Sequence, residues 1–155
     1  MADKELPERG ALVTLREITK DTLRGVLSLR VHETQARFVA DNATSIAQAH
    51  FSEEAWFRAI YAGEVPVGFV MLSLEPAKPE YWIWRLMIDR AHQGKGFGRA
   101  AIGLVEEHVR DQPGARELLL SHVQAEGNPG AFYESLSFEY TGDVDQGELV
   151  MRKKL

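Results

Sequence analysis

The feature that most constrains the fold is the stretch from Trp84 to Ile102, near the middle of the chain. It begins as an apolar run, passes through three glycines at alternate positions and continues as a helical pattern. Glycine adopts positive φ at little cost and lets a bound group approach the backbone closely. The turn leads into a helix N-terminus, where unpaired N–H groups favour an anion, and Lys95 and Arg99 add positive charge. The stretch predicts a strand, a phosphate-binding turn and a helix.

Two common phosphate-binding motifs do not match this turn. A P-loop places Lys and then Ser or Thr after its last glycine, whereas Gly98 is followed by Arg99 and Ala100. A dinucleotide-binding turn requires Gly-x-Gly-x-x-Gly, and Arg99 stands where its third glycine would lie. The alternative to a phosphate-binding turn is a glycine turn that binds no ligand and only joins the strand to the helix.

The hydrophobic periodicity predicts a single α/β domain over residues 1–155. Strands are predicted over residues 11–18, 55–61, 65–74, 80–88, 117–123, 138–141 and 147–152. Helices are predicted from a cap at Thr19 to Val31, over residues 45–50, from the glycine turn to about residue 111, and after Asn128. Strands 80–88 and 117–123 flank a long helix, so we expect a right-handed crossover that makes them parallel neighbours. A polar turn over residues 142–146 should join the last two strands.

Composition excludes several classes of function. The net charge of −5 argues against a nucleic-acid surface, which needs a clustered basic excess. The absence of cysteine removes thiolate metal sites and cysteine nucleophiles, and the five histidines lack ligand spacing, so we expect no metal. We also expect no membrane span, and the charged start lacks the apolar core of a signal peptide. A cytoplasmic location is the resulting expectation.

The residues Gln93-Gly94-Lys95-Gly96-Phe97-Gly98 read Gln-x-x-Gly-x-Gly, between an apolar strand and a helix. This segment resembles the acetyl-CoA pyrophosphate loop of the GNAT superfamily of N-acetyltransferases. A later segment with Asn128, Ala131, Tyr133, Leu136 and Phe138 is similar to the family's Asn…Ala…Tyr-x-x-x-Gly-Phe pattern, with Ser137 in place of the glycine. The resemblance covers nearly the whole chain. It implies the GNAT fold, a mixed and mostly antiparallel central sheet flanked by helices in the order β-α-α-β-β-β-α-β-α-β-β.

Within the superfamily, residues 81–98 resemble the bacterial spermine/spermidine acetyltransferases, and residues 38–49 and 66–69 are similar to the same group. This narrower resemblance implies a polyamine acceptor. An aminoglycoside, an amino acid, and a protein N-terminus or lysine remain open as acceptors. A non-catalytic acyl-CoA-binding sensor and a polyamine-binding module that does not use CoA are the alternatives to an enzyme.

The GNAT resemblance assigns acetyl-CoA as the acetyl donor and implies that the sheet opens beside strand 80–88 to hold the thioester. Backbone N–H groups from Gln93 to Arg99 would bind the pyrophosphate, and the strand edge before the turn would bind the pantetheine arm. An N–H near Met87 or Ile88 would polarise the thioester carbonyl. The expected donor-binding residues are Leu86, Met87, Ile88, Gln93, Gly94, Lys95, Gly96, Phe97, Gly98, Arg99 and Asn128.

The resemblance implies direct transfer to a neutral amine, with Tyr133 as the acid that protonates the departing thiolate. A tyrosine with a pKa near 10 is protonated at neutral pH, as this role requires. The base stays open among Glu33, Glu80, His122 and a water chain. For the acceptor we select Trp84, Arg85, Asp41 and His122; Trp82 and Trp84 share one sheet face and either contact the amine or fill the core. Family members often pair through terminal strands, which suggests a homodimer.

Overall fold

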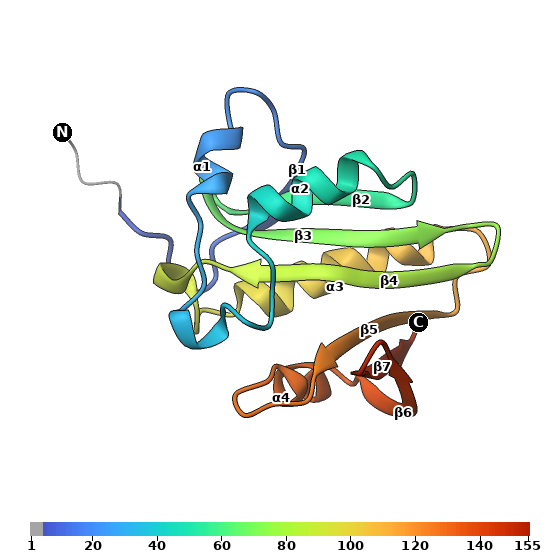
Figure 1. Ribbon diagram of the computed structural model, residues 1–155. Coiled ribbons are helices and arrows are strands. Elements are labelled where there is room, and N and C mark those ends of the chain that lie inside the picture. The colour runs from blue at the N-terminus through green and yellow to red at the C-terminus, as the bar shows by residue number, and fades with distance from the viewer. Residues whose placement is uncertain (1–4) are drawn as a thin grey trace.

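The computed structural model describes residues 5–155 and contains a seven-stranded sheet with helices on both faces (Figure 1). The strand order is β1-β2-β3-β4-β5-β7-β6, and all neighbours are antiparallel except β4 and β5. The strands are β1 Val13–Arg16, β2 Ala55–Ala62, β3 Val65–Glu75, β4 Glu80–Ile88, β5 Glu117–Val123, β6 Glu139–Asp145 and β7 Glu148–Lys154. The helices are α1 Leu23–Leu27, α2 Asn42–His50, α3 Phe97–Arg110 and α4 Gly130–Ser135, with 3₁₀ turns η1 Glu33–Gln35 and η2 Arg90–His92. The expected order of strands and helices and the parallel β4–β5 pair are confirmed.

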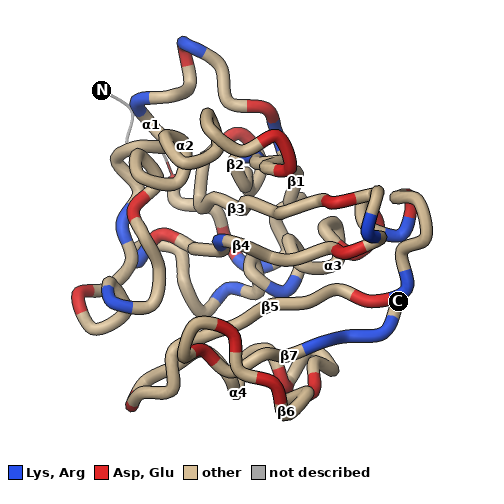
Figure 2. The backbone as a smooth tube through the Cα atoms, turned by 45° about the vertical axis from the view of Figure 1, so that its right-hand side comes forward, with Lys and Arg blue, Asp and Glu red and all other residues tan. Residues whose placement is uncertain are grey.

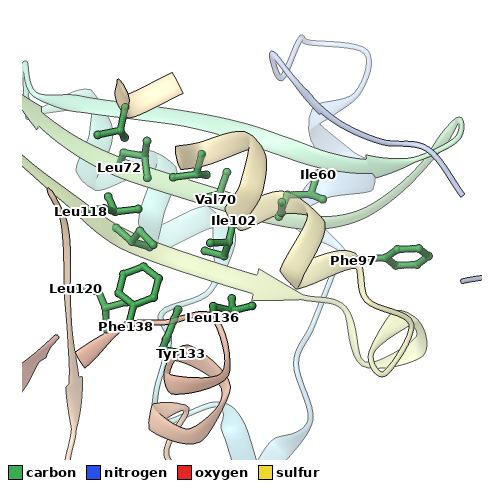
Figure 3. Close-up of a cluster of buried hydrophobic side chains, with 14 of the residues drawn as sticks. Ile60, Val70, Leu72, Phe97, Ile102, Leu118, Leu120, Tyr133, Leu136 and Phe138 are labelled. Carbon is green, nitrogen blue, oxygen red and sulfur yellow. The ribbon is translucent and has the colours of Figure 1, made fainter. Parts of the chain in front are cut away.

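The core consists of two layers, one on each face of the sheet. Helix α3 is amphipathic and buries Ile102 and Val105 against Val70 and Leu72 of β3. The same layer continues to β5 and α4, where Leu118, Leu120, Tyr133, Leu136 and Phe138 are buried (Figure 3). The opposite layer lies beneath α1 and α2 and includes Val26, Phe69, Met71 and Met87. Burial on both faces explains the continuous apolar runs of the central strands.

Strand β4 carries a β-bulge that decides which side chains face the opening of the sheet. Arg85 is paired with Met71, whereas the next position of β3, Leu72, is paired with Ile83, so Trp84 is the extra residue. A bulge bends its strand and increases the local twist. Ile83 therefore packs in the α3 layer, while Trp84 packs in the layer beneath α1 and α2.

Strands β4 and β5 separate immediately after their first contact. Within residues 5–155, the register contains one paired position between them, Trp82 with Leu119. Beyond it β5 turns away from β4, as Figure 1 shows. The edge of β4 from Ile83 to Ile88 therefore has backbone groups that β5 does not pair, and the expected opening of the sheet is confirmed.

Two helix boundaries differ from the sequence prediction. Helix α1 ends at Leu27 instead of reaching Val31, because the N–H of Arg30 donates to Asp89 Oδ1 at 2.8 Å instead of continuing the helix. Its N-cap is Thr22, not Thr19. Helix α2 begins at Asn42 instead of Ser45, because the Asp41 carboxylate accepts the N–H of Thr44 at 2.7 Å and caps it.

The last hairpin also differs from the prediction of a polar turn over residues 142–146. Strand β6 continues to Asp145, and the turn is formed by Gln146 and Gly147, which both have positive φ. Two consecutive residues with positive φ match the right-handed twist of paired strands. Gly142, with φ of 89°, lies instead where the β6–β7 register shifts.

Candidate functional site

A long cleft of about 1320 Å³ opens where β4 and β5 separate. One of its ends is the glycine loop between β4 and α3, and α4 and the β6–β7 hairpin form the wall opposite β4. The segment between η1 and α2 crosses the cleft, because Arg37 Nη2 donates to the carbonyl of Glu126, before α4, at 2.6 Å. The cleft thus brings together segments that are more than 100 residues apart in the chain.

The glycine loop presents a row of backbone donors. Gly94 and Gly96 have φ of 77° and 83°, and Gly96 is the residue before the first turn of α3. Within residues 5–155, no acceptor is found for the N–H groups from Gly94 to Arg99, whereas Ala100 N already donates to the carbonyl of Gly96. Unpaired donors at a helix N-terminus are well suited to bind a phosphate.

Gly98 leaves the approach to this loop open because it has no side chain. A Cβ atom at Gly98 would lie 3.3 Å from Phe132 Cζ of α4 and 3.6 Å from Ile88 Cγ1. The glycine therefore keeps room between α3 and α4, at the mouth of the cleft. A larger residue would displace Phe132 or narrow the route along the loop.

The loop is held from behind by side chains of the α1–α2 connection. Gln93 Nε2 donates to the carbonyl of Ile88 at 2.9 Å and to Gln35 Oε1 at 2.8 Å. Asp89 accepts the N–H of Ala91 at 3.1 Å in addition to that of Arg30. These bonds fix the loop backbone before any ligand is present, which reduces the entropy lost on binding.

Tyr133 lies on α4 and lines the cleft, although the residue is only 8% exposed. Its ring contacts those of Phe132 and Phe138 edge to face, with centroid distances of 5.2 and 5.6 Å. Burial raises the pKa of the Tyr133 phenol above its usual value, because the charged phenolate is poorly solvated there. The phenol therefore keeps its proton throughout the neutral range.

His122 lies at the end of β5 with both ring nitrogens engaged. Nδ1 is 2.9 Å from the carbonyl of Val123, and Nε2 is 2.9 Å from the hydroxyl of Tyr140. A carbonyl only accepts, so in the neutral ring Nδ1 carries the proton and Nε2 accepts from Tyr140. Nε2, the ring nitrogen without a proton in this tautomer, is therefore occupied by the Tyr140 hydroxyl.

The wall of β4 opposite α4 carries Trp84 and Arg85. The Arg85 guanidinium donates to Gln48 Oε1 of α2 at 3.0 Å and to the carbonyl of Trp84 at 3.1 Å. Burial lowers the pKa of Arg85, and the charge of Glu148 opposes this effect. Glu148 belongs to the facing hairpin and accepts from Ser121 Oγ at 3.3 Å. A guanidinium and a carboxylate thus lie on opposite walls of the cleft.

The acetyltransferase (GNAT) family model matches residues 13–138, which include the splayed strands, the glycine loop and Tyr133. The chain belongs to the GNAT family. This membership confirms the expected fold and the activity class, N-acetyl transfer with acetyl-CoA as the donor. The unpaired loop donors and the open edge of β4 fit a donor with a pyrophosphate and an amide-rich arm.

Relatives of this GNAT protein include the spermine/spermidine N(1)-acetyltransferase of Bacillus subtilis (strain 168). The two chains are 26% identical over 153 residues, which cover 92% of this chain and 99% of the relative. Among solved structures, the PaiA N-acetyltransferase of Thermoplasma acidophilum with coenzyme A is similar, with a TM-score of 0.69 and 16% identity over 93% and 99% of the two chains. The aminoglycoside acetyltransferase AAC(6')-Ib with coenzyme A has a TM-score of 0.74 and 16% identity over 92% and 95%.

Most residues selected from the sequence of this GNAT protein line one cleft. They are Trp84, Arg85, Leu86, Met87, Ile88, Gln93, Gly94, Gly96, Phe97, Gly98, Arg99, His122, Asn128 and Tyr133. Trp82 also lines it. Asn128 uses its amide within its own loop, donating to the carbonyl of Ala125 at 2.8 Å and accepting from Gly130 at 2.9 Å.

Three other selected residues lie elsewhere. Asp41 caps α2 and lines a separate small pocket, and the hydrogen bonds from Thr44 lower the pKa of its carboxyl. Lys95 turns away from the cleft, with its ammonium 2.9 Å from the carbonyl of Pro7. Glu33 is in η1 and does not line the cleft, whereas Glu80 does and accepts from Trp82 Nε1 at 2.7 Å.

Sequence reasoning missed Arg9, Arg37, Tyr140 and Glu148 of this GNAT protein. Arg9, Arg37 and Glu148 line the cleft, and Tyr140 holds His122. Each comes from a segment whose position depends on tertiary packing, so no local motif marks it. Among residues 5–155, we find no helix long and apolar enough to cross a bilayer, and no group of three or more potential metal ligands.

Proposed function

We propose that this GNAT enzyme acetylates a primary amine of a polyamine such as spermidine or spermine. The observation that carries the proposal is the charge of the cleft wall away from the glycine loop. Five carboxylates line the cleft, Glu54, Glu75, Glu80, Asp145 and Glu148. Acidic residues of the β6–β7 hairpin and of the β3–β4 turn are visible in Figure 2. A polyamine carries several ammonium groups, and these carboxylates offer partners for those that do not react.

The relatives support the same acceptor. The two Bacillus subtilis relatives are named as spermine or spermine/spermidine N(1)-acetyltransferases, and each match covers 92% of this chain. The tryptophans on β4 add a second element of recognition, because an ammonium is attracted to the face of an indole ring. Trp82 is oriented by its bond to Glu80, so an aromatic face and a carboxylate stand side by side.

In the proposed mechanism the glycine loop and β4 position the donor. The N–H groups from Gly94 to Arg99 bind the pyrophosphate, and the open edge from Leu86 to Ile88 pairs with the amides of the pantetheine arm. A backbone N–H near Met87 or Ile88 donates to the thioester carbonyl, whose oxygen gains negative charge as the amine attacks. These groups are fixed by the sheet, so they do not reorganise during the reaction.

The acceptor must react as a neutral amine, and we propose that the positive charge of Arg85 lowers the pKa of that amine. A positive charge nearby lowers the pKa of an amine, because the ammonium form is repelled. Glu148, across the cleft, would then bind an ammonium further along the polyamine. Burial keeps the Tyr133 phenol protonated but makes it a weaker acid, so we propose that it gives its proton to the departing thiolate while the attacking nitrogen gives up a proton that restores the phenol.

The proposal is tested by measuring acetyl-CoA consumption with spermidine, spermine, kanamycin, lysine, glutamate and an N-terminal peptide. We expect the highest kcat/KM with a polyamine. The Glu148→Gln variant should raise the KM for spermidine about tenfold and leave the KM for acetyl-CoA unchanged, because it removes one carboxylate from the acceptor wall. Glu107→Gln, on the exposed side of α3, is the matched control. A best substrate other than spermidine or spermine would refute the polyamine proposal.

A further inference from the structure

The N-terminal segment before β1 lies against the glycine loop and is tied to it at two points. Arg9 Nη2 donates to the carbonyl of Gly94 at 2.7 Å. In return, Lys95 Nζ donates to the carbonyl of Pro7 at 2.9 Å. The segment and the loop thus exchange side-chain to backbone bonds across 85 and 88 positions of the chain, so the segment covers the loop in one defined position.

The two bonds determine which positively charged side chain lies beside the cleft side of the loop. The Lys95 ammonium, which the sequence pattern places beside the phosphate, is drawn away to Pro7 and does not line the cleft. Arg9 does line the cleft, and its Nη1 lies 3.4 Å from where a Cβ atom of Gly96 would be. The Arg9 guanidinium therefore lies over the left-handed glycine that precedes α3.

The remaining donors of Arg9 are available at this position. A guanidinium has five N–H donors, and the Gly94 carbonyl is the one acceptor found for Arg9 within residues 5–155. The same glycines leave the backbone N–H groups of the loop without acceptors on the cleft side. A planar guanidinium binds phosphate oxygens in pairs, whereas an ammonium acts as a point charge.

We infer that Arg9 is a pyrophosphate-binding residue of the donor site, supplied by the N-terminal segment and held in place by the Gly94 carbonyl. The inference rests on the proposed use of acetyl-CoA by this loop. Arg9 would complete the loop's N–H row by contacting phosphate oxygens from the opposite side. Arg99, on the first turn of α3, then supplies the second positive charge near the loop.

The test is calorimetric titration of CoA and of 3′-dephospho-CoA into the wild type, Arg9→Ala, Arg9→Lys and the control Arg116→Ala. Arg116 is exposed and follows the C-terminal end of α3, whose other end is the loop, and its replacement removes the same charge. We expect Arg9→Ala to weaken both ligands about tenfold, Arg9→Lys to recover part of the loss, and Arg116→Ala to match the wild type. The kcat/KM with S-acetylpantetheine, which lacks the pyrophosphate, should be the same in Arg9→Ala and the wild type.

The outcomes separate this inference from the proposed function. If the wild type and Arg9→Ala bind CoA with equal affinity, the role of Arg9 is overturned and the use of acetyl-CoA is not. A loss seen with CoA but not with 3′-dephospho-CoA also overturns it, because the contact would then be to the 3′-phosphate. An equal loss with S-acetylpantetheine would show that Arg9 only supports the loop. A wild type that binds no CoA refutes both the inference and the use of acetyl-CoA.

Discussion

Replacement of Gly130 by alanine tests how α4 is packed against the end of β5. Gly130 is the first residue of α4, and a Cβ atom there would collide with the Tyr140 hydroxyl and lie 2.9 Å from Asn128 Oδ1 and 3.2 Å from His122 Nε2. In an unobstructed helix, alanine is more favourable than glycine by up to about 1 kcal/mol. Whether the variant is less or more stable therefore depends on whether the free-energy cost of the contact with Tyr140 exceeds this gain.

The structure indicates that the cost of the contact is the larger of the two. Overpacking costs about 1–3 kcal/mol, and displacing the Tyr140 hydroxyl leaves the buried Nε2 of His122 without its partner, at about 1–3 kcal/mol more. With each cost near the middle of its range, about 2 kcal/mol, and the helix gain about 1 kcal/mol, the expected net loss in the free energy of unfolding is roughly 3 kcal/mol. For a chain of this size, this corresponds to a decrease in Tm of roughly 6–12 °C.

The assay is urea unfolding followed by circular dichroism for Gly130→Ala, Tyr140→Phe and the double variant. Because Tyr140→Phe removes the atom that a Cβ would meet, we expect the two changes to be coupled by about 1–2 kcal/mol. Gly103→Ala is the control, since Gly103 lies within α3 and a Cβ there meets nothing within 4 Å. A Gly130→Ala variant as stable as the wild type, or two strictly additive changes, would refute this reasoning.

Three further predictions concern chemistry and pH. Tyr133→Phe should lower kcat by about 100-fold without changing the affinity for acetyl-CoA measured by calorimetry, and an unchanged kcat would exclude Tyr133 as the acid. Arg85→Gln should move the acid limb of the kcat–pH profile to higher pH, because the bound amine is then easier to protonate; a limb that does not move, or that moves to lower pH, would contradict this role. Burial, followed by the Arg58 guanidinium, lowers the pKa of His108 from 6.5. As the pH falls, the unfolded chain therefore binds a proton at His108 before the folded protein does, so the free energy of unfolding should decrease below about pH 6.5. Urea midpoints measured from pH 7.5 to 5 should decrease less in His108→Gln than in the wild type, and an identical pH dependence in the two proteins would argue against this assignment.

The amino-acid sequence by itself determined the order of the elements and the position of the donor loop. Both depend on local physics, because alternation marks a strand, spaced apolar residues mark a helix, and closely spaced glycines permit backbone angles that other residues rarely adopt. The bounds of β4 and β5 agree with the predicted ones for the same reason. The resemblance carried by Gln93–Gly98 and Tyr133 then identified the family that the comparison confirms.

The tertiary structure alone decided which charged groups meet at the cleft. Lys95 lies in the loop and yet points to Pro7, whereas Arg9 reaches the loop from a distant segment. Asp41 caps a helix, and Glu148 faces Arg85 because β7 pairs with β5. Side chains of this length choose partners by their position in three dimensions, and strand pairing sets that position across many tens of residues. Spacing in the sequence carries no information about such contacts.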